Sequence, residues 1–253
     1  MNVQFGKSVI YKFSVRICLF IWLNFFLSVC FGAKPDSPNY EVWELNSLKT
    51  IGGHPVKVFG NPQIVTTEIG KAIRFDGIHD RLLVDHNPIG DAKEFTIEVI
   101  FKPDSAYKIS QQPRFIHFQD EADTLSGWDQ ARRIMMELRL TPENKWYLDG
   151  FLLTDAGNVT LQNKNLTHPT RQWIHAALTY SNNTLKTYVN GIEEASGSVT
   201  FTEKVLNRVG KVSIGGRMNR LNYYCGLIKT LKITRKALKP DQFIKIGDKN
   251  RSY

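Results

Sequence analysis

The sequence is poor in glycine and proline, and this shortage excludes several classes of protein. Only 18 of its 253 residues are glycine and 10 are proline, too few for a collagen-like or a Gly/Pro-rich disordered chain. Hydrophobic residues make up 42% of the chain and charged residues 23%, which is an ordinary globular composition. A chain of this length can bury a large apolar core as one large domain or two small ones.

Cysteine is also scarce. Of the three cysteines, Cys18 and Cys30 fall in an apolar segment near the amino terminus, which leaves Cys225 with no partner for an internal disulfide. No pair of Cys or His residues has the sequence spacing of a zinc site. We therefore expect Cys225 to behave as a small hydrophobic residue rather than as a nucleophile.

Acidic residues are absent from the first 33 positions, where three Lys and Arg residues precede an apolar run over 17–29. This pattern is typical of an export signal, and the run is shorter than the roughly 20 residues of a spanning helix. We expect residues 1–32 to be a signal peptide; the alternatives are a lipoprotein signal ending before Cys30 and an uncleaved anchor. The mature chain would be secreted, periplasmic or at the cell surface, without membrane insertion unless a lipid is attached to Cys30.

A concentrated basic stripe is missing as well. Lys and Arg number 33 against 24 Asp and Glu, but the cations are spread among acids along the chain. A nucleic-acid-binding protein gathers its cations beside motifs that read a groove. There is also no phosphate-binding glycine loop, serine elbow or dinucleotide fingerprint. We expect no nucleic-acid partner.

Short runs of alternating apolar and polar residues, separated by turns, are present instead. The clearest runs are 95–101 and 133–140, and alternation of this kind gives each strand one face for a core. Asn190 and Gly191 suit a tight turn, and 239–245 could form a short turn of helix. Many such strands predict an all-β fold with two antiparallel sheets packed as a sandwich. Further strands are predicted over 114–119, 146–153, 173–180, 185–189, 211–214 and 227–234.

Three blocks of sequence carry a resemblance to a known family. The first is 70–84, with its Phe-Asp-Gly turn, followed by the strand 95–103 that ends in Lys-Pro. The second joins Trp-Ile-His-Ala-Ala in 173–180 to the Tyr-Val-Asn-Gly hairpin in 185–191. The third is 212–216 with 226–238. In order and spacing these blocks resemble the laminin-G-like, concanavalin A-like jelly-roll domains of exported bacterial proteins.

The resemblance implies a two-sheet antiparallel jelly roll, which we expect to be one domain over 42–247. A linker over 33–41 would precede it and a tail over 248–253 would follow. The fold alone does not give the function, because this jelly roll serves glycan binders, protein binders, glycosidases and lyases.

Calcium is a possible cofactor that follows from the same resemblance. Many relatives bind it between the Phe-Asp-Gly turn and the closing strand, which implies Asp76 and Asp80 as ligands here. Relatives carry an acidic pair in the closing strand where this chain has Lys229 and Thr230. Calcium takes about 6 to 8 oxygen ligands, so the cation at Lys229 counts against it. The alternative is that Asp76 and Asp80 only cap the turn.

Four polar side chains on three predicted strands form the best candidate site. Strand parity places Glu137 and Arg139 on the face of their strand that points away from the core. His117 and Tyr147 would lie beside them on neighbouring strands if Phe115 and His117 share a face. In a sugar site, an aromatic ring stacks on a pyranose while charged groups bind its hydroxyls. The alternative is a solvated face with Glu–Arg pairs, each worth about 0.2–1 kcal/mol.

The loop over 217–224 adds forked donors and aromatic rings before the closing strand. It would either contact the same ligand or merely close the sandwich. Its candidate ligand-binding residues are Arg217, Asn219, Tyr223 and Tyr224.

The leading hypothesis is an exported, non-catalytic module that binds a polysaccharide or surface glycoconjugate. One alternative is an enzyme of the same fold, either a uronate lyase or a glycosidase, in which His117, Glu137, Arg139 and Tyr147 are the catalytic candidates. The segments 115–117 and 136–139 faintly resemble two elements of jelly-roll alginate lyases, but in reversed order and without the third. No strand carries the clustered carboxylates of jelly-roll glucanases. Another alternative is a structural or adhesive module that binds protein.

Overall fold

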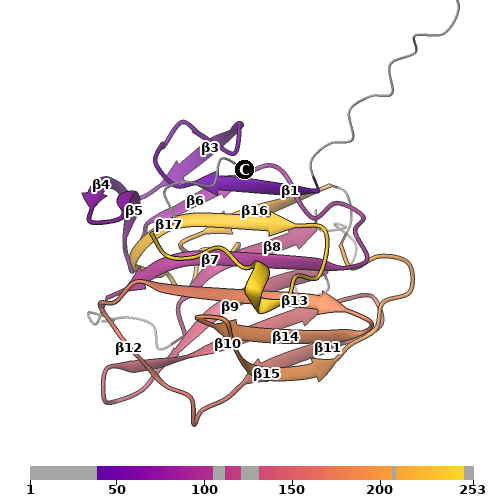
Figure 1. The fold of residues 1–253 in the computed structure, drawn as a ribbon. Helices are drawn as coiled ribbons and strands as arrows, with labels where there is room; N and C mark the ends of the chain where they lie inside the picture. The colour runs from indigo at the N-terminus through magenta and orange to yellow at the C-terminus, as the bar shows by residue number, and fades with distance from the viewer. Residues whose placement is uncertain (1–38, 105–111, 121–130, 207–208, 248–253) are drawn as a thin grey trace, which may run out of the picture. The chain divides into compact units, whose positions relative to one another are not determined.

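The computed structural model describes residues 39–104, 112–120, 131–206 and 209–247. The predicted signal peptide, with Cys18 and Cys30, lies outside these residues. Within them, two antiparallel sheets pack face to face as a sandwich, as the alternating pattern predicted (Figure 1). No helix among the described residues is long and apolar enough to span a membrane.

The first sheet contains eight of the described strands, in the order β15-β14-β13-β7-β17-β5-β4. β1 also pairs with β17, on the edge opposite β7. All of the pairings that connect the sheet are antiparallel. Its strands are β1 Tyr40–Glu44, β4 Gln63–Thr67, β5 Gly70–Asp76, β7 Phe95–Pro103, β13 Ile174–Ser181, β14 Thr184–Val189, β15 Ile192–Ser198 and β17 Cys225–Thr234.

The second sheet contains nine of the described strands, in the order β11-β10-β9-β8-β16-β6-β3-β2, with β12 paired to β10. Its central strands β8, β9 and β10 are neighbours, which matters for the candidate site. Its strands are β2 Thr50–Ile51, β3 His54–Phe59, β6 Arg81–Val84, β8 Arg114–Asp120, β9 Arg133–Leu140, β10 Lys145–Leu153, β11 Asn158–Gln162, β12 His168–Pro169 and β16 Gly210–Ile214.

The strands predicted from the sequence are all present, and their ends agree to within two residues. The predicted turn is also confirmed, because Asn190 and Gly191 have φ angles of 49° and 82° and connect β14 to β15. The predicted helical turn is the short 3₁₀ helix η1, Pro240–Gln242. The strands that sequence patterns missed include β3, β4 and β15, which are largely exposed and therefore lack a clear apolar face.

Aromatic rings from both sheets meet in the core. Phe101 of β7 stacks on Phe115 of β8 with ring centroids 4.7 Å apart, and Trp146 of β10 lies 5.5 Å from Phe101. All three side chains are fully buried. Burial of such rings removes a large apolar area from water and fixes the spacing of the two sheets.

The outer side of the first sheet is covered by the segment that follows η1 (Figure 1). Phe243 packs on Ala177 and Tyr188, and the backbone N–H of Ile244 donates to Glu98 Oε1 at 2.6 Å. The same carboxylate oxygen lies 3.2 Å from His175 Nε2. His175 is therefore a structural histidine.

Cys225 lies at the start of β17 and is half-buried without a disulfide. Burial and the nearby Asp104 and Asp76 raise the pKa of its thiol to about 11. The thiolate, which is the reactive form, is therefore scarce at neutral pH.

We predict slow alkylation of Cys225 by iodoacetamide at pH 8 in a chain whose Cys18 and Cys30 are replaced by serine. The rate should rise steeply above pH 9, and the denatured chain should react as an ordinary thiol with a pKa of roughly 8.5. Mass spectrometry of timed samples measures both rates. Equal rates in the folded and denatured chain at pH 8 would contradict the burial of this thiol.

Candidate functional site

The four site residues predicted on strands, His117, Glu137, Arg139 and Tyr147, lie on the side of the second sheet that faces away from the core, called here the polar face. Glu137 and Arg139 of β9 pair across the sheet with Asp149 and Tyr147 of β10. His117 of β8 lies directly opposite Ser213 of β16. The intervening residues Ile134, Met136, Leu138, Trp146 and Leu148 belong to the core.

Phe115 does not share the face of His117, which corrects one assumption of the parity argument. The register between β8 and β9 shifts between Arg114 and Ile116. This bulge places both Phe115 and Ile116 in the core and returns Arg114 to the polar face, opposite Glu137. The bulge also explains why strand parity failed to identify Arg114 as a site residue.

A chain of charged side chains crosses the polar face from β8 to β10. Arg114 Nε donates to Glu137 Oε1 at 2.7 Å, and Glu137 Oε2 lies 3.4 Å from Arg139 Nη2. Arg139 Nε donates to Asp149 Oδ2 at 2.6 Å, and Gln162 of β11 donates to the same oxygen at 2.8 Å. Glu137 and Asp149 are each 1% exposed, so these charges are held by each other rather than by water.

Burial raises the pKa of the Glu137 carboxyl, and the nearby Asp149 acts in the same direction. Arg114 and Arg139 oppose that rise by stabilising the charged form. Arg114 also keeps one guanidinium nitrogen, Nη1, buried without a hydrogen-bond partner among residues 39–104, 112–120, 131–206 and 209–247.

His117 is the second centre of the polar face. Its Nδ1 accepts a hydrogen bond from the backbone N–H of Met218 at 3.1 Å, which assigns the ring proton to Nε2 in a neutral imidazole. Nε2 is buried and has no hydrogen-bond partner in the part of the chain that the structure describes. Burial lowers the pKa of His117 well below its usual value, and the guanidinium groups of Arg217, Arg133 and Arg114 lower it further.

Arg81 of β6 lies beside the same loop. Its Nη1 donates to the Met218 carbonyl at 2.9 Å, and its guanidinium lies 4.2 Å from the centre of the Phe59 ring. Among the described residues, its Nε is buried without a hydrogen-bond acceptor, as are Arg114 Nη1 and His117 Nε2. Two buried acceptors on the same face, Glu137 Oε2 and Asp149 Oδ1, likewise have no hydrogen-bond donor in that part of the chain.

The four strand candidates share the polar face but form no single hydrogen-bonded cluster. Glu137 and Arg139 are in contact, whereas His117 accepts a hydrogen bond from the Met218 N–H of the loop. Tyr147 is half-buried beside Arg139. The polar face is thus an extended surface with an ion-pair chain and a donor cluster around His117.

The loop over 217–224 divides into two kinds of residue. Arg217 and Tyr223 are half-buried and Asn219 is exposed, so a ligand can reach them. Tyr224 is fully buried and packs against Phe115 with ring centroids 5.9 Å apart. Our expectation that Tyr224 contacts a ligand is therefore corrected, because this ring belongs to the core.

Asp76 and Asp80 cap the turn between β5 and β6. Asp76 Oδ1 accepts from the backbone N–H groups of Ile78, His79 and Asp80 at 2.8–2.9 Å. Asp80 accepts from the N–H of Asn61 at 2.6 Å and from that of Asp76 at 3.0 Å. Among the described residues, no further His, Cys, Asp or Glu completes a metal-binding group with them. These bonds show that Asp76 and Asp80 cap the turn, and calcium binding at these residues stays a prediction.

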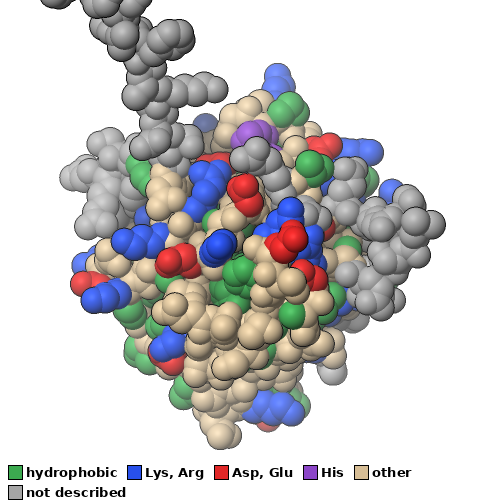
Figure 2. Space-filling model, turned by 90° about the vertical axis from the view of Figure 1, so that its right-hand side faces the viewer, with side chains coloured by type: hydrophobic (Ala, Val, Ile, Leu, Met, Phe, Trp, Pro, Cys, Tyr) green, Lys and Arg blue, Asp and Glu red, His purple; other side chains and the backbone are tan. Residues whose placement is uncertain are grey.

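Figure 2 shows one side of the molecule, where Lys and Arg side chains lie among Asp and Glu side chains. Among the ion pairs of the described residues, Lys186 Nζ lies 2.9 Å from Glu193 Oε2. The described side chains on the side drawn do not gather into the continuous basic stripe that a nucleic-acid backbone requires.

Comparison with solved structures supports the fold. The chain is similar to domain 4 of AbnA, a GH43 extracellular arabinanase from Geobacillus stearothermophilus, solved in complex with arabinotriose. The TM-score is 0.54 and the identity 18%, over 82% of this chain and 96% of that one.

Two toxin binding domains are similar as well. The binding domain of Paraclostridial Mosquitocidal Protein 1 gives a TM-score of 0.58 and 16% identity, over 80% of this chain and 50% of that one. The binding domain of botulinum neurotoxin DC, in complex with SialylT, gives 0.55 and 14%, over 80% and 49%. The chain thus spans about half the length of these toxin domains.

No curated protein matches the chain in sequence. The family model described as the concanavalin A-like lectin/glucanases superfamily matches residues 76–243, which is more than half of the chain. The match begins at the Phe-Asp-Gly turn and ends in the segment that covers the first sheet. The chain therefore belongs to the concanavalin A-like lectin/glucanases superfamily.

Proposed function

We propose that the chain is a non-catalytic binding module that recognises an acidic glycan, such as a uronate-containing polysaccharide, on its polar face. The observation that carries the proposal is a set of three buried donors that have no acceptor among the described residues, Arg81 Nε, Arg114 Nη1 and His117 Nε2. A buried donor without an acceptor costs about 1–3 kcal/mol, so a ligand that displaces the groups covering these atoms and supplies acceptors recovers this cost.

Charge favours an acidic ligand over a neutral one. The guanidinium groups of Arg81, Arg114, Arg133 and Arg217 all lower the pKa of His117. Glu137 Oε1 and Asp149 Oδ2 are bound by arginine or glutamine, and only Glu137 Oε2 and Asp149 Oδ1 have no hydrogen bond to the described residues. A planar guanidinium matches the two oxygens of a carboxylate in a bidentate bond. The half-buried Tyr147 and Tyr223 offer rings for the apolar faces of sugar residues.

The arrangement favours binding over catalysis. A general base needs a free lone pair near the substrate, but His117 uses Nδ1 to accept the Met218 N–H and carries its proton on Nε2. Glu137 and Asp149 are both held in ion pairs with arginine. The similar structures named above include carbohydrate-bound domains, which supports a glycan ligand, and we propose that the module acts after export.

Binding to acidic glycans should depend on the donors of the polar face. A glycan array and calorimetry with polyuronate, sulfated and neutral oligosaccharides would measure this. We expect polyuronates to bind at least 10-fold more tightly than neutral chains, and His117→Asn and Arg81→Lys each to weaken binding by 10-fold or more.

The matched control is Arg74→Gln, because Arg74 lies on β5 of the other sheet and its side chain is 50% exposed. This variant should bind like the wild type. Two results would refute the acidic-glycan proposal: binding only to neutral glycans, or binding only to a protein partner, in either case with the same affinity in His117→Asn as in the wild type. The second result would leave a structural or adhesive module.

The wild-type chain should release no product from the same polysaccharides. Absorbance of the unsaturated uronate reports elimination, and reducing ends report either elimination or hydrolysis. Turnover that is lost in Glu137→Gln and Tyr147→Phe would instead establish the enzyme alternative, as lyase or glycosidase according to which signal appears.

The neutral state of His117 predicts a dependence of stability on pH. Histidine in the unfolded chain gains a proton below about pH 6.5, whereas His117 in the folded chain stays neutral. The unfolded state then binds more protons, so the free energy of unfolding falls as the pH falls below about 6.5. The raised pKa of Glu137 gives a contribution of opposite sign, so only the difference between variants is informative.

Urea unfolding at pH 7.5 and 5.5 would measure this effect. His117→Asn should lose about 1 kcal/mol less stability than the wild type over this interval. An equal loss in both proteins would show that His117 takes up a proton in the folded state.

A further inference from the structure

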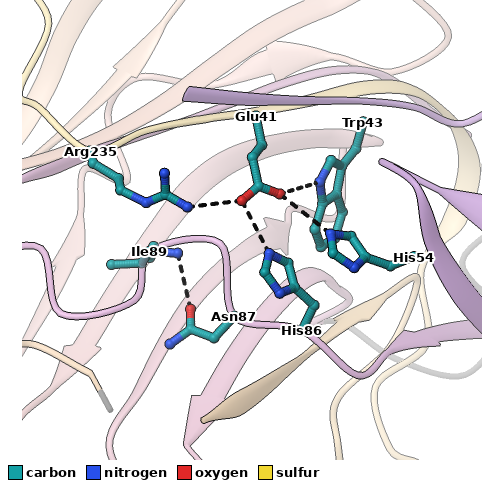
Figure 3. A network of polar contacts seen from close by, with 7 residues as sticks. All are labelled: Glu41, Trp43, His54, His86, Asn87, Ile89 and Arg235. Atoms are coloured by element: carbon teal, nitrogen blue, oxygen red, sulfur yellow. Dashed lines mark hydrogen bonds and ion pairs between the residues drawn. The ribbon is translucent and has the colours of Figure 1, made fainter. Parts of the chain in front are cut away.

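One carboxylate and two imidazoles converge where the two sheets meet (Figure 3). Glu41 lies on β1 of the first sheet, His54 on β3 of the second sheet, and His86 just after β6. One potential ligand atom from each lies within 4.8 Å of the other two. Because the three residues are far apart in sequence, no spacing motif could have revealed the group.

The distances suit a small metal ion. Glu41 Oε1 lies 3.1 Å from His86 Nε2, and Glu41 Oε2 lies 3.8 Å from His54 Nε2. The two imidazole rings are stacked, with centroids 3.8 Å apart and an interplanar angle of 15°, so both Nε2 atoms face the same carboxylate. A tetrahedral zinc ion with bonds of about 2.0–2.1 Å holds its donor atoms roughly 3.3 Å apart. The two carboxylate–imidazole separations bracket that value. Because the lone pair of Nε2 lies in the plane of its ring, one of the two nearly parallel rings must rotate for both histidines to bind the same ion.

Two neighbouring side chains fix the carboxylate. Trp43 Nε1 donates to Glu41 Oε2 at 3.1 Å, and Arg235 Nη2 donates to Glu41 Oε1 at 2.9 Å (Figure 3). The buried Trp43 ring also lies about 6 Å from the His54 and His86 rings, at 6.1 and 6.2 Å. Groups that hold metal ligands in position in this way are typical of metal sites. Arg235 also offsets one negative charge, which favours micromolar rather than nanomolar affinity.

Solvent can reach the group. The side chains of His54, His86 and Glu41 are 33%, 30% and 21% exposed. An ion can therefore enter, and a water molecule or an external ligand can occupy a fourth position.

We propose that Glu41, His54 and His86 bind one divalent transition-metal ion of the zinc type. Two imidazoles and one carboxylate form a donor set that zinc prefers, whereas calcium and magnesium prefer oxygen donors alone. The ion would join β1 of one sheet to β3 of the other and would stabilise the sandwich at this edge. The site is independent of the acidic-glycan proposal, since it shares no residue with the donors of the polar face.

The test is calorimetric titration of the untagged, chelator-treated chain with Zn²⁺ alone, followed by thermal unfolding with and without zinc. We expect one zinc per chain, a dissociation constant in the micromolar range or below, and a higher Tm in zinc. Cu²⁺ at the same site should quench the fluorescence of Trp43 and compete with zinc. Ca²⁺ should have neither effect.

Variants decide whether these residues hold the ion. His54→Gln and His86→Gln keep a polar side chain, and each should weaken zinc binding by at least 10-fold and abolish the rise in Tm. His168→Gln is the matched control, because His168 Nε2 pairs with Glu194 Oε1 at 2.6 Å without a second histidine. It should bind zinc like the wild type.

Two outcomes would overturn the proposal. One is that zinc up to about a hundred micromolar neither binds nor changes Tm in a wild-type chain that is folded by circular dichroism. The other is that zinc binds the His54→Gln and His86→Gln variants as tightly as the wild type. Lower metal-free stability in these variants, with no response to zinc in the wild type, would identify the group as a structural network only.

Discussion

Successive side chains of a β-strand point to opposite sides, and this alternation couples the core of the protein to its polar face. Phe118 and Leu138 are packed between the sheets, so His117 and Glu137 must lie on the outside. A shift of one residue in register would exchange the two sets and bury charge in the core. The aromatic contacts that hold the sheets together therefore also fix the positions of the candidate ligand-binding groups.

The polar face is costly to build, and the cost argues for preorganisation. Buried ion pairs such as Arg114–Glu137 lose hydration that their attraction only partly restores, and removing one partner typically costs about 3–5 kcal/mol. Similar strands could have presented a solvated face of exposed charges instead. Groups that are already fixed before a ligand arrives lose little freedom on binding, which improves affinity. The ion-pair chain thus holds the neighbouring donors of Arg114 and His117 in place.

Much of the fold could be predicted because its central strands are amphipathic. Strands β7, β9 and β13 have regular apolar faces and ends marked by turn residues, whereas the exposed β3, β4 and β15 do not. The side of Glu137, Arg139 and Tyr147 followed from parity alone.

Other features depend on irregular or long-range structure that sequence patterns do not contain. A bulge in β8 inverted the positions of Arg114 and Phe115, and tertiary packing drew Tyr224 from its polar loop into the core. The group of Glu41, His54 and His86 arises only when two sheets meet. Arg81 reaches the candidate site through a loop contact to Met218, which no local pattern predicts.

The central claim is that an acidic sugar accepts the unpartnered N–H of His117. The most direct measurement is a nitrogen–proton NMR spectrum of the imidazole groups, recorded as a polyuronate oligosaccharide is added. Our account predicts a neutral ring protonated on Nε2 in the free chain, and a large shift of the Nε2–H signal on saturation while the Nδ1 signal stays near its free value. A saturating oligosaccharide that leaves the His117 signals unchanged, or a free ring that is already doubly protonated at pH 7, would contradict it.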